Sequence, residues 1–181
     1  MIVSAHDGYP RWLNSGADFI EIDVRRDARG VFILSHDEPK PGTKNPTLDE
    51  VVRAAAGRIR IQLDLKESVH ELELIERCPL DRIVVTTGNM ESIQRIKERY
   101  PEVRAGLTKQ FVEETTADFI ALDHHHATEE ALAFCAGYRI PVWVWTVDDK
   151  REMRRFMSDP RIEGIITNRP DEALKLRTAR S

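Results

Sequence analysis

Residues 19–39 read FIEIDVRRDARGVFILSHDEP, and this stretch decides how the strands of the chain are counted. Residues 18–24 place phenylalanine, isoleucine and valine at short intervals, which is typical of a strand. Asp27 and Gly30 have the spacing of a type I hairpin turn. We therefore expect residues 31–37 to return antiparallel to residues 18–24, as the second arm of a hairpin and not as a further parallel strand.

The hairpin is expected to bring a histidine back to two carboxylates. Glu21 and Asp23 lie two positions apart on a strand, so their side chains project from the same face. A turn centred between residues 28 and 29 places His36 opposite Glu21, and a bulge shifts this pairing by one residue. The three side chains are thus predicted to meet at the end of the strand.

Strands and helical segments alternate along the whole chain. With the first arm of the hairpin, we expect parallel strands at 1–6, 18–24, 59–66, 81–88, 103–109, 118–123, 140–148 and 162–168. Eight strand–helix units close into a barrel, whereas the alternative, an open doubly wound sheet, usually has about five or six strands. We predict an α/β protein, a compact (β/α)8 TIM barrel with a β-hairpin extension after strand 2, forming a single domain over residues 1–181.

Capping residues mark where several helices begin. Thr47 followed by Glu50 forms a capping box, Ser68 and Asn89 are expected N-caps, and Pro170 is expected at a helix start. Helical segments are predicted at 9–16, 46–58, 68–78, 89–100, 111–116, 128–138, 149–159 and 170–180. Because a typical barrel of this kind takes about 250 residues, the loops between these segments must be short.

The composition bounds the class of protein. Of 181 residues, 41% are hydrophobic and 32% charged, which is typical of a soluble globular chain. The net charge of −4 predicts no general affinity for nucleic acid or anionic membranes. No apolar run approaches the ~20 residues of a membrane span, and we see no signal peptide. Cys78 and Cys135 are expected to be free buried thiols, which favours a cytoplasmic location.

Polar and aromatic side chains gather at the predicted carboxyl ends of the strands. They are His6, Glu21, Asp23, Asp64, Lys66, Asp123, His124, Trp143, Trp145 and Asn168. In barrels of this kind the functional residues sit at the carboxyl ends of the strands. The rim is therefore the predicted site.

Three of these side chains are candidate metal ligands. Glu21, Asp23 and Asp64 converge from neighbouring strands and would repel one another unless a cation joined them. Because the donors are all oxygens, Mg²⁺ or Ca²⁺ suits them better than zinc.

Two histidines and a lysine complete the predicted chemistry. His6 and His36 flank the carboxylates and can act as acid and base, since imidazole titrates near neutrality. Lys66 supplies positive charge for an anionic substrate. A metal, a cation and an acid–base pair favour phosphoryl chemistry over acyl transfer, and the sequence has no Gly-x-Ser-x-Gly motif.

Several rim residues have a structural interpretation. The three histidines at 124–126 are expected in an exposed loop, because they lack the i, i+4 spacing of a helical zinc site. Trp143 and Trp145 are expected to pack, with Trp145 closer to the mouth of the barrel. Asn168 and Asp123 are interpreted either as helix caps or as substrate contacts.

Five stretches together resemble the glycerophosphodiester phosphodiesterase family, whose members fold as eight-stranded α/β barrels. The resemblance spans nearly the whole chain. It is carried by GADFIEIDVRRDARGVFILSHDEP (16–39), PTLDEVV (46–52), IQLDLK (61–66), VWTVDDKREMRRF (144–156) and IEGIITNRP (162–170). The last two are specific when they occur together.

The resemblance implies a role for each site residue. It implies metal ligation by Glu21, Asp23 and Asp64, acid–base catalysis by His6 and His36, phosphate binding by Lys66, and a substrate-pocket wall from Trp145. The implied activity is metal-dependent cleavage of a small glycerophosphodiester with a glycerol- or lipid-derived alcohol, a reaction of lipid metabolism. Such enzymes can work through a cyclic phosphate, either opening it with water or stopping there as lyases.

The chain departs from the family pattern at the first strand end. The family has His-Arg-Gly there, whereas this chain has His-Asp-Gly, with Asp7 in place of the arginine. Arginine pairs with phosphate through a planar fork, and aspartate repels it. Asp64 also replaces a longer glutamate. The alternative function is therefore a catalytically impaired barrel that binds an anionic or polyol ligand. Two alternatives would keep the site active without the family's arginine: Asp7 as a further metal ligand, or Arg104 as the replacement positive charge.

Overall fold

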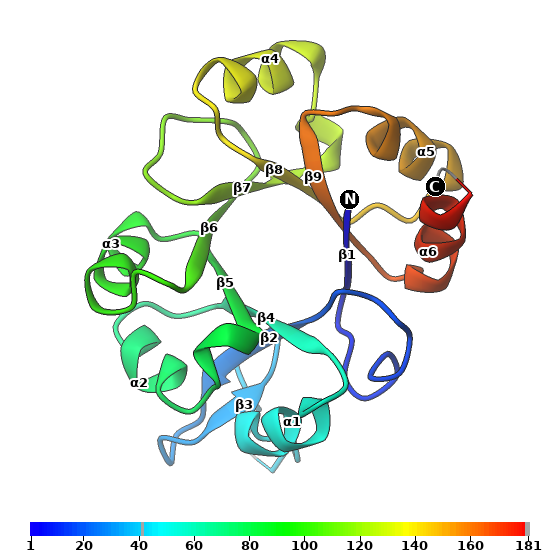
Figure 1. Cartoon of the computed structure of the whole chain (residues 1–181). Coiled ribbons are helices and arrows are strands. Elements are labelled where there is room, and N and C mark those ends of the chain that lie inside the picture. The colour runs from blue at the N-terminus through cyan, green and yellow to red at the C-terminus, as the bar shows by residue number, and fades with distance from the viewer. Residues whose placement is uncertain (41, 180–181) are drawn as a thin grey trace.

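Eight parallel strands close into a barrel in the computed structural model, which describes residues 1–40 and 42–179. The first strand, β1 (Ile2–Ala5), pairs with both β2 (Phe19–Arg26) and β9 (Ile162–Thr167), so the ring has no open edge there. The other parallel strands are β4 (Arg60–Leu65), β5 (Ile83–Thr87), β6 (Arg104–Lys109), β7 (Phe119–Asp123) and β8 (Val142–Trp145). Figure 1 shows the ring seen along its axis. The predicted TIM barrel is confirmed.

The predicted hairpin is present, but its register differs from the expected one. Strand β3 (Phe32–Leu34) runs antiparallel to β2, with Val24 paired to Leu34. Three residues, 28–30, form the loop, and Gly30 takes a positive φ of 81° that favours glycine. This loop shifts the pairing by one residue, the shift that a bulge would produce. His36 therefore follows the strand and does not lie opposite Glu21.

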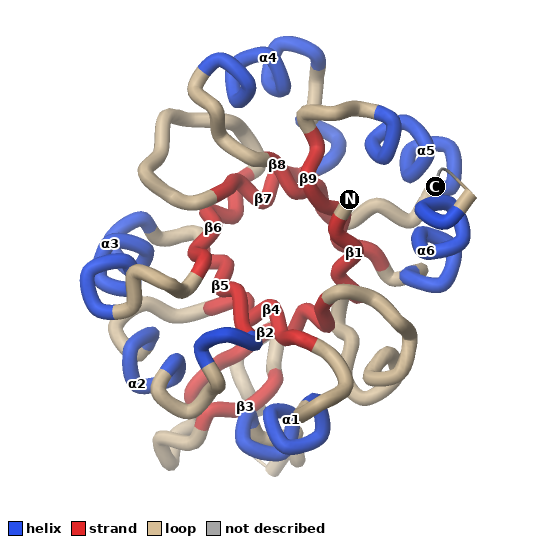
Figure 2. The backbone as a smooth tube through the Cα atoms, viewed as in Figure 1, coloured by secondary structure: helices blue, strands red, loops and turns tan. Residues whose placement is uncertain are grey.

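The described residues form six α-helices. They cover the outside of the barrel, as Figure 2 shows in blue around the red strands. They are α1 (Leu48–Ala55), α2 (Glu71–Ile75), α3 (Met90–Arg99), α4 (Glu129–Gly137), α5 (Lys150–Ser158) and α6 (Pro170–Thr178), with 3₁₀ turns η1 (Leu80–Arg82) and η2 (His124–His126). Both hydrogen bonds of the predicted capping box between Thr47 and Glu50 are made. Asn89 caps α3, and Pro170 begins α6, as predicted.

Other helix predictions were wrong. Ser68 does not cap α2, which begins only at Glu71 after a residue that makes no side-chain cap. Residues 9–15 form turns and a bend, and 111–116 form no helix. A segment this short becomes helical only where packing supports it, as in α2, whose Leu74 and Ile75 are buried. The predicted last helix ends within the described chain at 178, and its expected end at Arg180 lies outside the described residues.

The inside of the barrel is filled at the end away from the mouth. Phe119 and Trp143 stack there with ring centroids 4.6 Å apart, and both side chains are fully buried. Gly106 leaves room for them, because a Cβ at that position would come within 2.3 Å of the Phe119 ring. Trp143 is thus a packing residue, as predicted. Above this filled floor, a cavity lies towards the carboxyl ends of the strands.

Replacing Trp143 with alanine should remove this floor. We expect Trp143→Ala to lower the free energy of unfolding by about 3–5 kcal/mol, because a large cavity replaces a fully buried indole. Phe111→Ala is the matched control, since that ring is 66% exposed and its loss should change stability by about 0.5 kcal/mol or less. Urea unfolding followed by circular dichroism measures both; equal stability of the two variants would contradict the prediction.

The remaining bulk predictions concern thiols and membranes. Cys78 and Cys135 are free and buried, as predicted, and burial raises the pKa of the Cys78 thiol to about 12. Among the described helices, none has the length and apolar character needed to cross a bilayer.

Candidate active site

A cavity of about 340 Å³ opens at the carboxyl ends of the strands. Its wall includes every residue predicted to bind metal or substrate or to act in catalysis: His6, Glu21, Asp23, His36, Asp64, Lys66 and Trp145. Along each strand, side chains point alternately into the barrel and out towards the helices. The inward-pointing side chains are apolar at the floor and polar at the rim, so the cavity above the aromatic floor has polar walls. The structure therefore brings the predicted site residues together, while their roles stay predictions.

The three carboxylates converge at the base of this cavity. Asp23 on β2 pairs in register with Asp64 on β4. Glu21 lies two residues before Asp23 on the same face of β2. One oxygen from each of the three lies within 4.8 Å of the others. Glu21 is only 4% exposed, and burial raises its pKa well above its usual value, with the charges of Asp23 and Asp64 adding to the rise.

Lys66 lies directly against two of the carboxylates. Its Nζ is 2.8 Å from Asp23 Oδ1 and 2.6 Å from Asp64 Oδ2. Burial alone would lower the pKa of Lys66, but the two carboxylates outweigh it and raise the pKa. The expectation that a cation joins the carboxylates is thus met in part by the chain itself.

The donor set fits a divalent cation. Three carboxylates against one ammonium leave two negative charges when all are ionised, and the donors are hard oxygens of the kind that Mg²⁺ and Ca²⁺ prefer. Glu21 Oε2 accepts a hydrogen bond from the Asp7 backbone N–H at 3.1 Å but has no lysine partner of its own. A divalent ion would compensate this buried charge.

Asp64 is oriented by polar groups inside the barrel. Its Oδ1 accepts a hydrogen bond of 2.7 Å from Thr86 Oγ1, and Thr86 in turn accepts one from the buried Gln62. Gln62 and Thr86 were not predicted from the sequence as site residues. The signal was present, because Gln62 lies two positions before Asp64 and therefore on the same face of β4.

His6 is held by an amide that is itself held by a carboxylate. Its Nδ1 lies 2.9 Å from Asn168 Oδ1, and Asn168 Nδ2 donates to Asp148 Oδ2 at 2.7 Å. An ionised carboxylate only accepts hydrogen bonds, so the NH₂ group of Asn168 must face Asp148 and its oxygen must face His6. The hydrogen therefore sits on Nδ1, and Nε2 lies towards the carboxylates, 4.0 Å from Glu21 Oε2.

Asn168 and Asp148 thus position His6. Burial alone would raise the pKa of Asp148, but hydrogen bonds from Asn168 and Thr167 outweigh it and lower the pKa, which keeps this carboxylate ionised. From the sequence, Asn168 was expected to be a helix cap or a substrate contact, and no role was predicted for Asp148. Asn168 directly follows β9 and Asp148 lies three positions after β8, and this closeness to the rim is the feature that could have identified them.

His36 forms the outer wall of the cavity. Its side chain is 73% exposed, and Nδ1 lies 3.0 Å from Asp37 Oδ1. Its backbone carbonyl accepts a hydrogen bond from Arg25, which holds the end of the hairpin against the barrel. The hairpin therefore delivers His36 to the mouth, as predicted, although the register differs.

The chain was compared with family models, with the sequences of known proteins and with solved structures. No family model matches the chain. A glycerophosphodiester phosphodiesterase of Caldanaerobacter subterraneus subsp. tengcongensis is 23% identical over 217 aligned residues, which cover 93% of this chain and 89% of that protein. The predicted resemblance to the glycerophosphodiester phosphodiesterases is confirmed.

Solved structures of this family share the fold over nearly the full length of both chains. The glycerophosphodiester phosphodiesterase of Parabacteroides distasonis has a TM-score of 0.84 and 20% identity, covering 99% of this chain and 98% of that one. A phosphodiesterase of Oleispira antarctica, solved with the product sn-glycerol-3-phosphate, has a TM-score of 0.84 and 14% identity, covering 98% and 97%.

Asp7, the departure from the family pattern, contributes through its backbone. The residue is exposed and has a φ of 45°, and its N–H donates to the buried Glu21 carboxylate. Gly8 follows because a Cβ there would lie 2.7 Å from Ile20. The suggestion that Arg104 replaces the missing arginine was wrong: it begins β6, at the end of the barrel away from the mouth, and pairs with Glu163.

Trp145 and the histidines at 124–126 also lie at the rim. Trp145 borders the cavity, as predicted, and its Nε1–H donates to the Ala121 carbonyl at 2.8 Å, which fixes the indole. The histidines at 124–126 were expected in an exposed loop, but they form η2, and only 12% of the His124 side chain is exposed. Asp123 caps this turn, which is one of its two predicted roles.

Proposed function

We propose that the protein is a metal-dependent phosphodiesterase that cleaves glycerophosphodiesters. The observation that carries the proposal is the single cavity in which two imidazoles, three carboxylates and one ammonium meet. The relatives support the substrate class, because one carries that activity in its name and another binds sn-glycerol-3-phosphate. The cavity is large enough for a small diester but not for a long acyl chain buried in full.

The carboxylates Glu21, Asp23 and Asp64 would hold the metal. When bound, Mg²⁺ or Ca²⁺ offsets the negative charge of the phosphate. Lys66, which lines the same cavity, adds positive charge that would attract the phosphate oxygens. The indole of Trp145 provides a flat apolar surface for the carbon chain of the alcohol. Its hydrogen bond to the Ala121 carbonyl holds this surface in place.

The two histidines exchange protons with the substrate. One imidazole removes the proton from the glycerol hydroxyl that attacks phosphorus, and the other gives a proton to the oxygen of the departing alcohol. The products of this step are a cyclic phosphate and the free alcohol. Water can then open the ring to a phosphomonoester, with the imidazoles in reversed roles. His6, held through Asn168, is pre-organised for this exchange.

Phosphorus NMR tests the function directly. The purified protein is incubated with glycerophosphocholine, glycerophosphoethanolamine and a lysophospholipid, with Mg²⁺, Ca²⁺ or EDTA. We expect a phosphomonoester or a cyclic phosphate only with metal. Metal binding without any product across this panel would instead favour the impaired barrel, for which Asp7 in place of the family's arginine is the specific observation.

Asn168 offers a test of the positioning network. We expect Asn168→Ala to lower kcat by about 10-fold, the equivalent of losing one hydrogen bond at the rim, with a smaller change in KM. Asn168→Asp is the informative companion, because it keeps an acceptor for His6 Nδ1 but opposes Asp148. Steady-state kinetics measure both variants; an unchanged kcat in Asn168→Ala would show that His6 needs no such support.

The cellular setting remains a proposal as well. We propose that the protein acts in the cytoplasm on a small-molecule diester, with no nucleic-acid partner. The free buried thiols and the net charge of −4 support this setting. Fractionation of cells that express the protein would test the location.

A further inference from the structure

A second group of metal-binding side chains lies outside the cavity. Asp123 ends β7, and His124 and His125 begin the 3₁₀ turn η2 that follows it. One oxygen of Asp123 and one nitrogen of each imidazole lie within 4.8 Å of one another. None of these three borders the main cavity in the described part of the chain, although Asp123 pairs with Trp145 of the cavity wall in the strand register.

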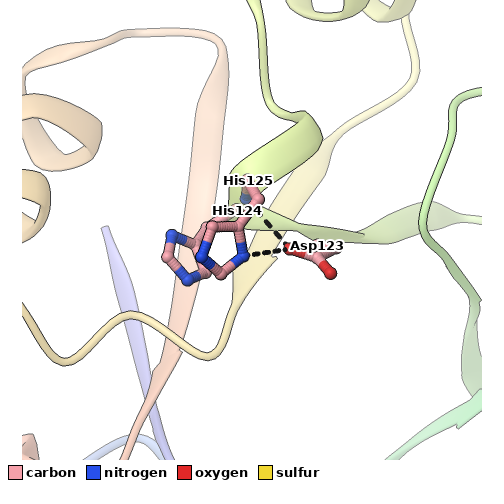
Figure 3. Close-up of side chains that lie close together, drawn as sticks. All are labelled: Asp123, His124 and His125. Carbon is pink, nitrogen blue, oxygen red and sulfur yellow. Dashed lines mark hydrogen bonds and ion pairs between the residues drawn. The ribbon is translucent and has the colours of Figure 1, made fainter.

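The three side chains lie close together, and Figure 3 shows the two rings overlapping and Asp123 joined to His125 by dashed lines. His125 contacts Asp123 Oδ1 twice, through Nδ1 at 2.9 Å and through its backbone N–H at 2.9 Å. The rings of His124 and His125 lie one over the other with centroids 3.8 Å apart. The second oxygen, Oδ2, lies 3.8 Å from His126 Nδ1, which is beyond hydrogen-bond distance.

A fourth side chain approaches from a different element. Glu152 on α5 places Oε2 3.1 Å from His124 Nδ1, at angles that do not make a hydrogen bond. Nδ1 of His124 is nevertheless buried, and among the described residues it has no hydrogen-bond partner. A small rotation of the ring would align it with Glu152. Histidines that bind metal commonly give their other N–H to a carboxylate in this way.

Helix capping accounts for only part of this arrangement. The cap uses a single oxygen of Asp123 and the backbone N–H of His125. It does not explain why two imidazoles and a second carboxylate, from Glu152, gather at the same point, or why a buried imidazole nitrogen is left without a hydrogen bond at a cost in free energy. A shared cation explains the gathering, since the two carboxylates carry the charge to balance it, and it would hold the His124 ring turned so that Nδ1 meets Glu152.

We propose that Asp123, His124 and His125 bind a divalent transition-metal ion of the zinc class, with Glu152 orienting His124. Imidazole nitrogens favour Zn²⁺, Ni²⁺ or Cu²⁺, whereas the oxygen donors of the main cavity favour Mg²⁺ or Ca²⁺. Donors at about 2.0–2.2 Å from zinc lie about 3–3.5 Å from one another. The contact of 2.9 Å between His125 and Asp123 is already close to this spacing, whereas the nitrogen of His124 is placed only within 4.8 Å of the other two donors, so binding requires the three donors to close in.

The experiment separates the two sites by their chemistry. Untagged protein is stripped with a chelator and dialysed into excess Mg²⁺ to fill the oxygen site, and Zn²⁺ is then titrated by calorimetry. We expect one equivalent of Zn²⁺ to bind. Co²⁺ in its place should give a visible absorption spectrum of nitrogen ligation that differs from the spectrum of hydrated Co²⁺.

Variants identify the ligands. We expect His124→Ala and His125→Ala each to weaken Zn²⁺ binding by more than about 10-fold, and Glu152→Gln to weaken it by about 10–100-fold. Asp123→Asn is a second ligand variant that keeps an oxygen to cap η2, so the turn should still fold. His70→Ala is the matched control, because that histidine lies beside Arg26 and should leave zinc binding unchanged.

Two results would overturn the proposal. One is the absence of a zinc equivalent in the wild-type protein with Mg²⁺ present; the other is undiminished zinc binding by both the His124→Ala/His125→Ala double variant and Asp123→Asn. Glu21→Gln should keep the zinc equivalent, since Glu21 belongs to the other site. Because the readout is binding and not hydrolysis, this proposal and the proposed function can fail independently.

Discussion

His6→Ala should lower kcat for glycerophosphodiester cleavage by about 10²–10⁴-fold, the usual contribution of a general acid or base. The loss should be large because His6 is held in one tautomer by Asn168 and its Nε2 faces the carboxylates. His36→Ala should fall in the same range if the exposed imidazole closes over the substrate. Steady-state kinetics by phosphorus NMR or a coupled glycerol phosphate assay measure both.

A change of leaving group tells the two histidines apart. A diester with a p-nitrophenyl leaving group needs no proton from the enzyme, so the variant that lacks the general acid should lose much less activity on it. The variant that lacks the base should stay impaired on both substrates. His70→Ala serves as the control, because it removes an imidazole away from the cavity. Turnover by His6→Ala equal to that of the wild-type protein would remove His6 from the reaction.

Glu21→Gln should have the second large effect: it should lower the metal-dependent activity and raise the stability of the metal-free protein. We expect kcat to fall by at least about 100-fold, because a ligand to an ion worth several kcal/mol is lost. The metal-free variant should, in contrast, be more stable than the metal-free wild-type protein at pH 8. Burial makes the ionised Glu21 unfavourable, and the neutral amide of glutamine removes that cost.

The pH dependence of this difference follows from the raised pKa of Glu21. The folded protein binds this proton more tightly than the unfolded chain, so the group contributes stability below the usual glutamate pKa of 4.5 and loses it as pH rises towards the folded pKa. The stability gap between Glu21→Gln and the wild-type protein should therefore grow with pH from 4.5 upwards. Thermal unfolding at several pH values, with EDTA, measures it.

Metal should cancel the gap. Mg²⁺ or Ca²⁺ should raise the melting temperature of the wild-type protein and leave that of Glu21→Gln nearly unchanged, since binding to the folded state alone stabilises it. Glu91→Gln is a matched control, because the Glu91 side chain is 81% exposed on α3 and lies outside the cavity. Equal responses of wild-type protein and Glu21→Gln to metal would exclude Glu21 as a ligand.

The rim residues could be predicted because strands alternate their faces and barrels expose their carboxyl ends. Glu21, Asp23 and Asp64 needed only the two-residue period and the order of the strands, and they do converge. The largely covered side chain of His124 could not be predicted in the same way. Its burial depends on α5, which brings Glu152 against it from a later part of the chain.

The sequence by itself determined the number of strands, the hairpin, the capping box at Thr47 and the position of the polar rim, because these depend on spacing between near neighbours. Only the tertiary structure decided which rim groups touch. Barrel closure brings His6 within hydrogen-bond distance of Asn168, 162 positions later, and lays Lys66 across Asp23 and Asp64. The loop of three residues decided the hairpin register. Contacts of this kind depend on ångström distances between strands, which local spacing does not encode.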